Sequence, residues 1–195
     1  MENQKVSDSD LIREVLSGNP RSYAALLSRY QHMVFTLAMR MLGHRELAEE
    51  TTQDIFVKVY RSLRSFRGDS KFSTWLYRIA YRSILDVRAR ENRKPLRANE
   101  YSEVQACSLT GESTWEALMV TERRAHILKA LEQLSPRDKS VLSLYYLQEL
   151  SIKEIAEVTD LSTSVVKVSL FRARERFKEL LESTEEGLQL RTYNT

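Results

Sequence analysis

The sequence predicts an all-α protein of two small helical domains, and two observations support that prediction. Leu, Ala, Glu and Arg, which favour helices, dominate the chain, and its 195 residues include only five glycines and three prolines. Apolar residues recur at three- and four-residue steps in several segments, which is the spacing of a helix with one buried face. We therefore expect almost no β-sheet.

The first predicted helix is short, and Asp8 or Ser9 is expected to cap it. It ends at a Gly-Asn-Pro break, after which Pro20 suits the first turn of a second helix. That second helix spans about 21–42 and carries one apolar stripe, and Gly43 is expected to end it.

The third and fourth predicted helices span about 45–66 and 71–92 and are separated by a polar break at 67–70. Asp69 or Ser70 is expected to cap the fourth helix. The predicted inward face of the third helix consists of Leu47, Ala48, Ile55, Phe56, Val59, Tyr60 and Leu63. The four helices complete a first domain, residues 1–94.

Apolar periodicity disappears after this domain, and residues 95–120 are rich in Asn, Ser, Glu, Gln and Thr. We expect a flexible tether there. Cys107 lies within it. A redox sensor is one interpretation of this cysteine, but no flanking basic residue lowers its pKa, which favours an incidental thiol. Residues 121–183 are expected to form a second helical domain, followed by a frayed tail at 184–195.

The second domain contains the pattern of a helix-turn-helix. Ser151-x-x-Glu154 is a capping box that opens a short helix, and residues 159–161 form a break. Ser162 or Thr163 then caps the last helix. Two short capped helices around a tight turn are typical of proteins that place the second helix in a DNA major groove.

The composition argues against several classes of function. No apolar run approaches the ~20 residues of a membrane span, and no export signal precedes the first helix, so we expect a cytoplasmic protein. A single cysteine excludes internal disulfides and thiolate zinc sites, and the three histidines lack ligand spacing. No nucleotide cradle or nucleophile motif is present, so we expect neither a cofactor nor enzymatic activity.

Charge is strongly segregated although the formal net charge is only +3. Residues 61–97 carry eleven basic and three acidic side chains, a local charge of +8, whereas the segments on either side are balanced or acidic. Such an excess is typical of a nucleic-acid contact, and the alternative is a solvated basic face.

Within this basic segment, Lys71, Arg78 and Arg82 fall within ~40° of one another on a helix of 100° per residue. Trp75 lies beside them, and Tyr77 and Tyr81 lie on adjoining faces. Basic residues with aromatic neighbours suit single-stranded or melted DNA, because bases can stack while the backbone charge is neutralised. The alternative for Trp75 is an ordinary place in the core.

The last helix has a second candidate DNA surface, opposite its apolar stripe. Lys167 and Arg172 can donate to guanine edges or phosphates, and apolar side chains there can touch a thymine methyl. The alternative is again a solvated basic face. The candidate residues are Ser164, Lys167, Val168, Phe171 and Arg172, with Arg174 further along and suited to phosphate.

The third helix has an acidic first half, which repels DNA and suits a protein partner. Glu46, Glu49 and Glu50 are equally explained by the favourable effect of acids at a helix start, but Asp54 lies too far along for that. Gln53 and Phe56 are further candidates for exposed contact residues on this helix.

Taken together, these segments resemble the extracytoplasmic-function (ECF) sigma factors of bacterial RNA polymerase, over nearly the whole chain. Residues 48–60 look like region 2.2, which in the family grips the coiled coil of the polymerase β′ subunit. The resemblance therefore assigns core-polymerase binding to Gln53, Asp54 and Phe56. It implies two helical domains, no catalytic residues and no cofactor.

Residues 66–80 are similar to regions 2.3 and 2.4, whose loop captures a flipped base of the minus-ten element and whose helix binds the separated strand. This resemblance implies minus-ten contacts for Phe66, Arg67, Lys71, Trp75, Arg78 and Arg82.

Residues 134–138, 150–156 and 170–174 resemble region 4.2, which reads the minus-thirty-five element as duplex and meets the β flap. Val165 and Ser169 depart from the Thr and Arg that many relatives have there, and Tyr145 stands where some have a DNA-contacting arginine. The promoter sequence is therefore not implied. The resemblance also implies an anti-sigma factor as partner.

Two other classes remain open from the residues alone. A stand-alone helix-turn-helix regulator with an amino-terminal sensor domain explains residues 136–182 but not the basic, aromatic fourth helix. A helical module that binds only protein leaves the Arg-rich helices unexplained.

Overall fold

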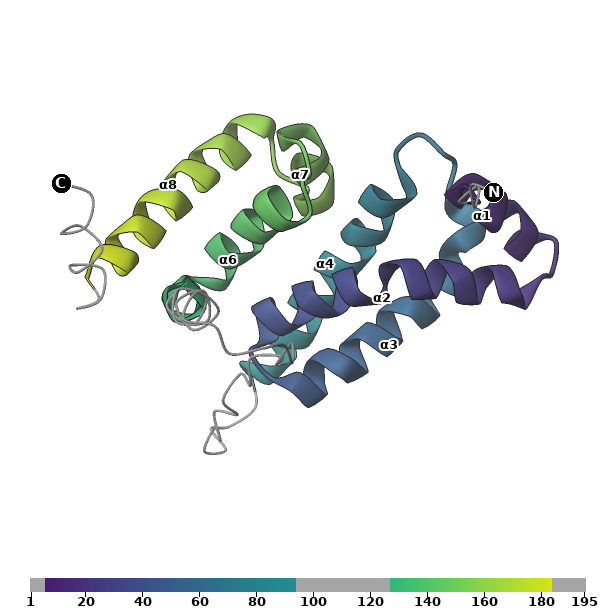
Figure 1. Ribbon diagram of the computed structural model, residues 1–195, viewed down its shortest axis with the longest axis horizontal. Helices are drawn as coiled ribbons and strands as arrows, with labels where there is room; N and C mark the ends of the chain where they lie inside the picture. Colours follow the sequence, from purple (N-terminus) through teal and green to yellow (C-terminus); the bar gives the residue numbers. More distant parts are fainter. Residues whose placement is uncertain (1–5, 94–126, 184–195) are drawn as a thin grey trace, which may run out of the picture.

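The computed structural model describes residues 6–93 and 127–183, and every regular element in these two ranges is helical. The prediction of an all-α fold is confirmed. The predicted tether with Cys107, and the predicted tail, lie outside the described residues. The elements, labelled in Figure 1 where there is room, are α1 (Asp8–Leu16), α2 (Pro20–Leu42), α3 (Arg45–Ser62), η1 (Leu63–Ser65), α4 (Phe72–Glu91), α6 (Pro136–Leu142), η2 (Ser143–Leu147), α7 (Ile152–Thr159) and α8 (Thr163–Glu182). Residues 127–133 are also helical.

The first unit consists of α1 to α4. Figure 1 shows α2 and α3 side by side, and α4 packs against both. The apolar stripes predicted from the spacing meet in its centre, where Leu26, Val34, Leu37, Ile55 and Leu76 are fully buried. Burial of these stripes is the main stabilising contribution to the unit.

Local signals set most helix ends in this unit, with two corrections. Pro20 lies in the first turn of α2 and Gly43 ends it in the left-handed conformation (φ 71°), both as expected. Asn19, which the sequence pattern did not single out as a cap, caps α2. Ser7, rather than Asp8 or Ser9, caps α1 because its hydroxyl accepts from the Asp10 N–H. The capping prediction for α4 is also wrong, because the N-cap is Lys71 and no side chain bonds the free N–H groups.

The second unit is the predicted helix-turn-helix with its supporting helices. Ser135 caps α6 ahead of Pro136, and α6 continues into the wider π-type turn of η2. α6 packs on α8, and a small cluster of buried side chains holds them together. The cluster consists of Leu134, Val141, Leu142, Leu170 and Ala173.

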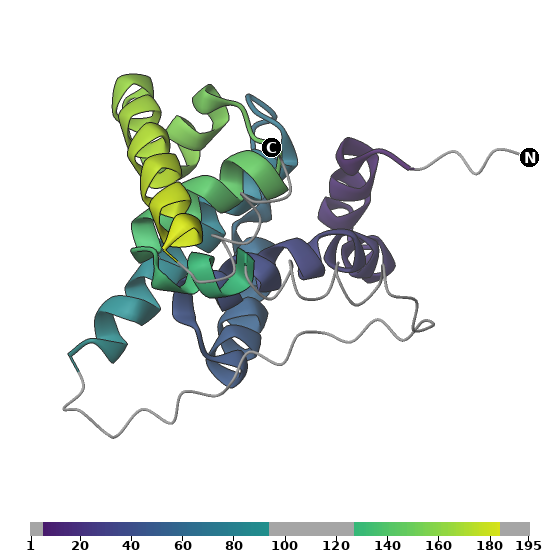
Figure 2. The ribbon, with the colours of Figure 1, turned by 60° about the vertical axis from the view of Figure 1, so that its left-hand side comes forward.

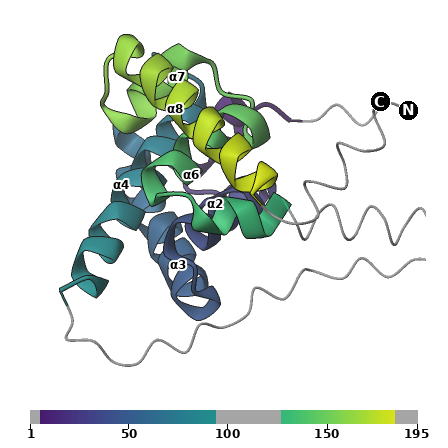
Figure 3. The ribbon, with the colours of Figure 1, turned by 90° about the vertical axis from the view of Figure 1, so that its left-hand side faces the viewer.

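The two units pack on each other, which the sequence does not predict. α7 contacts α4, and α6 contacts α2. Figures 2 and 3 show the green and yellow helices of the second unit lying against the blue and teal helices of the first. Five buried residues of the second unit join the apolar cluster of the first: Leu144, Leu150, Ile155, Val158 and Val166.

Candidate nucleic-acid interface

The predicted basic stripe lies on one exposed face of α4. Lys71, Arg78 and Arg82 are all exposed, as the helical spacing predicts. None of the three is free, however, because each forms an ion pair with an acidic residue of α7 or of the turn that follows it. Lys71 Nζ lies 2.9 Å from Glu154 Oε1. Arg78 Nη2 lies 2.7 Å from Asp160 Oδ1.

Arg82 completes this contact by bonding the same aspartate through two nitrogens. Its Nε and Nη2 donate to Asp160 Oδ2 at 2.9 and 2.5 Å. Guanidinium and carboxylate groups form their strongest hydrogen bonds in such charge-assisted pairs. Asp160 is therefore shared by two arginines that lie one helical turn apart.

An aromatic cluster lies where the loop before α4 enters the helix. The ring centroid of Trp75 lies 5.4 Å from that of Phe66 and 5.7 Å from that of Phe72. Phe72 is buried, whereas Phe66 and Trp75 are half-buried. Trp75 is thus partly core and partly accessible, between the two alternatives that the sequence leaves open. Arg67 is exposed in the same loop.

The two tyrosines predicted to flank the basic stripe do not face solvent. Tyr77 is 1% exposed and Tyr81 is also buried, so the expectation of exposed aromatic neighbours at these positions is wrong. The Tyr77 hydroxyl donates to Gln148 Oε1 of the second unit. Burial, with a smaller contribution from Tyr30, raises the pKa of Tyr77, so the hydroxyl remains a neutral donor.

The candidate protein-binding face of α3 is exposed only in part. Gln53 and Asp54 are exposed, as expected. Phe56 is only 6% exposed, so its expected exposure is wrong and its predicted place on the inward face is right. Its carbonyl accepts a hydrogen bond from the Tyr23 hydroxyl. Burial is the main cause that raises the pKa of Tyr23 to about 12.

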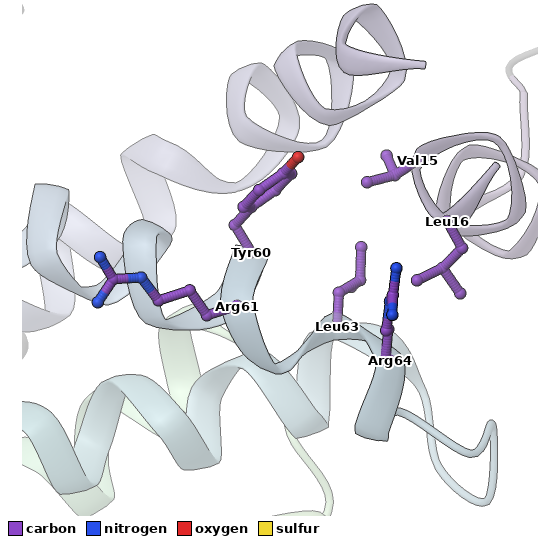
Figure 4. Close-up of a pocket in the computed structure, with 6 residues that line it drawn as sticks. All are labelled: Val15, Leu16, Tyr60, Arg61, Leu63 and Arg64. Carbon is purple, nitrogen blue, oxygen red and sulfur yellow. The ribbon is translucent and has the colours of Figure 1, made fainter. Parts of the chain in front are cut away.

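Tyr60 is a residue on this helix that the sequence pattern misplaces. The apolar spacing predicts it inside, but it is 54% exposed. Figure 4 shows its ring at a pocket of about 230 Å³ that α1 lines from one side, with Val15 and Leu16, and the end of α3 from the other. Tyr23 packs edge-on against Tyr60, with ring centroids 4.8 Å apart.

The helix-turn-helix has the predicted geometry. Ser151 and Glu154 form the complete capping box at the start of α7. Asp160 ends α7 in the left-handed conformation (φ 56°), and Ser162 caps α8 by accepting from the Val165 N–H. The turn between α7 and α8 is therefore held by bonds at both of its ends.

The candidate reading face of α8 is exposed along its whole length. Phe171 is 63% exposed, and large apolar side chains are rarely left so accessible without a binding role. Val166 faces the core, and Val165 is exposed. The Arg174 guanidinium lies 5.1 Å from the ring centre of Tyr145, a cation–π distance. All six predicted residues are exposed: Ser164, Lys167, Val168, Phe171, Arg172 and Arg174.

The acidic partners Glu154 and Asp160 are functional candidates that sequence reasoning missed. Burial tends to raise the pKa of Glu154, but hydrogen bonds from the Ser151 backbone, Lys71 and the Ser151 hydroxyl lower it to about 2. The hydrogen bond from Arg82 is the main cause that lowers the pKa of Asp160. The capping box and the turn were the only sequence signals at these positions.

The described part of the chain has neither a candidate membrane span nor a candidate metal cluster. No helix within residues 6–93 and 127–183 has the length and apolarity to cross a membrane. The same residues contain no group of three or more His, Cys, Asp or Glu side chains arranged to hold a metal ion.

Comparison with known proteins assigns the chain to a family. Residues 26–94 match the family Sigma-70 region 2, and residues 124–177 match Sigma-70, region 4. The RNA polymerase sigma-H factor of Pseudomonas aeruginosa is 31% identical over 181 residues, which cover 90% of this chain and 94% of that one. The chain is an ECF-type sigma factor. The ECF RNA polymerase sigma-E factor of Escherichia coli K12 is 33% identical, over 88% of this chain and 93% of the relative.

Two solved structures have the same fold. CnrH in complex with the cytosolic domain of CnrY is 23% identical, with a TM-score of 0.62 over 91% of this sigma factor and 99% of that chain. The sigma factor RpoE in complex with the anti-sigma factor NepR from Bartonella quintana is 20% identical, with a TM-score of 0.63 over 85% and 99% of the two chains.

The matched families coincide with the two structural units of this sigma factor. The region 2 match includes most of α2 and all of α3 and α4, so it contains the basic stripe. The region 4 match includes α6, α7 and most of α8, so it contains the helix-turn-helix. Both candidate DNA surfaces therefore lie in segments characteristic of sigma factors.

Proposed function

We propose that this sigma factor binds core RNA polymerase in the cytoplasm and directs it to specific promoters. The observation that supports this most is the presence of two separate surfaces with DNA-binding chemistry, one on α4 and one on α8. A stand-alone helix-turn-helix regulator needs only the second. The proposed division is region 2 in residues 1–94, a linker at 95–120, region 4 in 121–183 and a tail at 184–195.

In this proposal, the α4 surface binds the melted minus-ten element. Lys71, Arg78 and Arg82 neutralise the backbone of the separated strand, while Phe66 and Trp75 offer ring faces to unstacked bases. Arg67 follows Phe66 in the loop before α4. Opening DNA costs stacking energy of about 1.4 kcal/mol per base-pair step, and capture of unstacked bases offsets part of that cost.

The α8 surface reads the minus-thirty-five element as duplex. Arg172 and Lys167 donate to guanine edges or phosphates, Ser164 bonds either, and Val168 and Phe171 contact thymine methyl groups. Arg174 holds phosphate from its position over Tyr145. Region 4 also meets the β flap of the polymerase.

The exposed face of α3 binds the coiled coil of the β′ subunit. Gln53 and Asp54 are the contact residues on this face, because both side chains are exposed. Phe56 belongs to the same proposed site but is buried beneath it, so it positions the helix through packing. We also propose an anti-sigma factor as partner, since the structurally similar sigma factor RpoE was solved in complex with the anti-sigma factor NepR.

Transcription with purified components tests this function. Core RNA polymerase supplemented with the protein should start transcripts at defined positions downstream of a promoter mapped after overexpression, and core enzyme alone should not. If the protein neither binds core enzyme nor adds promoter-specific initiation, the proposed function is wrong.

Asp54→Ala should weaken binding to core polymerase, because it removes an exposed charge from the proposed contact face. The matched control is Glu49→Ala, which removes the same charge from the same helix at ~140° around its axis. Glu49 pairs with Arg45 at 2.9 Å, but both side chains are exposed and such pairs contribute little stability. Titration of each labelled variant with core enzyme measures its affinity. Equal affinities of the two variants for core enzyme would show that Asp54 is not part of the contact.

A further inference from the structure

In the contact between the two units, acidic residues pair with three of the six side chains that the proposed function assigns to minus-ten DNA. Each of the three cations of the α4 stripe is bound to Glu154 or Asp160 of the helix-turn-helix. A carboxylate and a backbone phosphate present the same kind of anionic oxygen to arginine and lysine. DNA phosphates and these two carboxylates therefore need the same donors.

Both carboxylates are held in place by the helix-turn-helix itself. Glu154 Oε2 accepts from the Ser151 backbone N–H at 2.9 Å, while its other oxygen faces Lys71. Asp160 is the left-handed residue that ends α7, and its own N–H bonds the Ala156 carbonyl. The motif that positions the reading helix α8 thus also positions an acidic pair toward α4.

An apolar centre lies beside these ion pairs. Tyr77 of α4 is fully buried and donates to Gln148 of region 4. Ile155 and Val158 of α7 belong to the same cluster of buried side chains as the region 2 core. The contact therefore combines an apolar centre with an ionic rim, the anatomy of a specific protein interface.

A solvent-open pocket lies at the edge of the contact. It has a volume of about 280 Å³, and Tyr81 and Leu85 of α4 line it together with Pro136 of α6. Arg88 and Arg137, one from each unit, line the same pocket. Like charges at one hollow repel each other, so they oppose closer approach of the units at this edge.

The reading face of α8 is not part of this contact. Its candidate base-contacting residues, Phe171 at 63% among them, are exposed, and no ion pair within the described residues involves them. The two DNA surfaces thus differ in the same molecule. The three cations of the α4 stripe are paired with carboxylates, whereas the cations of the reading face are not.

We propose that the helix-turn-helix inhibits minus-ten binding within the chain, with Glu154 and Asp160 occupying the α4 cations in place of DNA phosphates until the two units separate. This inference rests on the proposed function of α4. In the closed form the protein binds duplex minus-thirty-five DNA but not the separated minus-ten strand. Separation of the units, on binding polymerase or promoter, frees the α4 cations for DNA. Melting of the promoter DNA is thereby coupled to assembly of the sigma factor with polymerase.

The test compares Asp160→Asn with Glu157→Gln in the full-length chain. Asn adopts the left-handed conformation readily, so the first variant removes the shared charge and preserves the turn. Glu157 is exposed on α7 and forms no ion pair with another described residue, so the second removes an equal charge away from α4. Adding Glu154→Gln to the first variant strengthens the effect and retains a side chain suited to the capping box.

Two readouts are measured on each protein. Energy transfer between dyes at Gln31→Cys on α2 and Glu179→Cys on α8, in a Cys107→Ser background, reports separation of the units. Affinity for a single-stranded oligonucleotide with the minus-ten sequence reports access to α4. Asp160→Asn should lower transfer and tighten single-strand binding at least about threefold, because a larger fraction of molecules is open. Glu157→Gln should change neither, and affinity for minus-thirty-five duplex should be alike in both variants.

Three outcomes would overturn the inference. Unchanged transfer in Asp160→Asn would show that the ion pairs do not hold the units together. Tighter single-strand binding without a change in transfer, or an equal gain in Glu157→Gln, would show a general charge effect. Promoter-specific transcription by the unmodified protein separates these failures from failure of the proposed function, because it depends on the function and not on the closed form.

Discussion

Asp160 has two structural roles in this sigma factor. Its backbone ends α7 in the left-handed conformation that the helix-turn-helix needs, and its carboxylate binds Arg78 and Arg82 of the other unit. The turn pattern predicts the helix break at residues 159–161 that this backbone conformation completes. The second joins positions that lie 82 and 78 residues apart, and no local pattern contains it.

At the same scale, Arg172→Ala should reduce discrimination between minus-thirty-five sequences. Arg172 is exposed on the reading face of α8, and loss of a bidentate base contact costs about 1–3 kcal/mol at the position that it reads. Binding to a set of duplexes substituted one position at a time measures this.

Lys178→Ala serves as the comparison, since Lys178 is also exposed but lies further along α8. Loss of a phosphate contact there should weaken all duplexes equally and reduce the salt dependence of binding. If Arg172→Ala also weakens every duplex equally, Arg172 contacts phosphate rather than a base.

α7 is short and contacts both units. It has only eight residues, yet it packs on α4 and on α8, and its first turn is held by the Ser151–Glu154 capping box. Isolated helices of this length are unstable in water, so its packing and its cap must stabilise it. The capping box was predicted from the sequence, whereas the contact with α4 was not.

The capping carboxylate predicts a pH dependence of folding. The pKa of Glu154 falls from 4.5 to about 2 in the folded protein, because hydrogen bonds from Ser151 and Lys71 outweigh the effect of burial. A lowered folded-state pKa contributes stability that is complete above the unfolded value and is lost as the pH falls toward the folded value. This contribution should therefore decline between pH 4.5 and about 2.

Urea unfolding at about pH 5 and about pH 3 measures this decline, with Glu154→Gln as the reference. Glutamine does not titrate, so the variant should lose less stability between the two pH values than the unmodified protein. An equal loss in both proteins would show that other carboxylates cause the acid sensitivity.

On the scale of the whole molecule, the two units share one apolar cluster although each has its own family signature. Region 2 brings the larger core, and five buried residues of region 4 extend it. Within the described residues, the separate cluster of region 4 has five buried side chains. Small helical units of this kind gain much of their stability from neighbours, which favours the closed arrangement in the absence of DNA and polymerase.

Tyr77→Phe should weaken the contact between the units without disturbing region 2. It removes only the hydroxyl that donates to Gln148, and the net value of such a bond is about 0.5–1.5 kcal/mol. The energy-transfer pair on α2 and α8 should report a larger open fraction.

The control for this prediction is Tyr81→Phe, four residues further along α4. Tyr81 is also buried but donates no hydrogen bond to another described residue, so its hydroxyl should be dispensable for closure. A change of equal size in both variants would show that the hydroxyl of Tyr77 is not specific to the contact.

Much of the candidate site could be predicted because it depends on residues close in sequence. The alignment of Lys71, Arg78 and Arg82 follows from helical spacing, and the caps at Ser151 and Ser162 follow from short motifs. The misplaced residues are those for which two patterns competed. Tyr60 fits the apolar spacing of α3 but lies at its exposed edge, and Tyr77 is polar enough for a surface yet is covered by region 4.

The sequence alone determined the helices, their breaks, the helix-turn-helix and the two basic surfaces, because hydrogen bonds and side-chain spacing within about four residues specify them. Only the tertiary structure decided which faces are covered. Burial and ion pairing depend on which helices meet, and α4 meets α7 across a long separation in the chain. For that reason the sequence predicted two candidate DNA surfaces, and the structure alone showed that the cations of the α4 stripe are paired with the protein's own carboxylates.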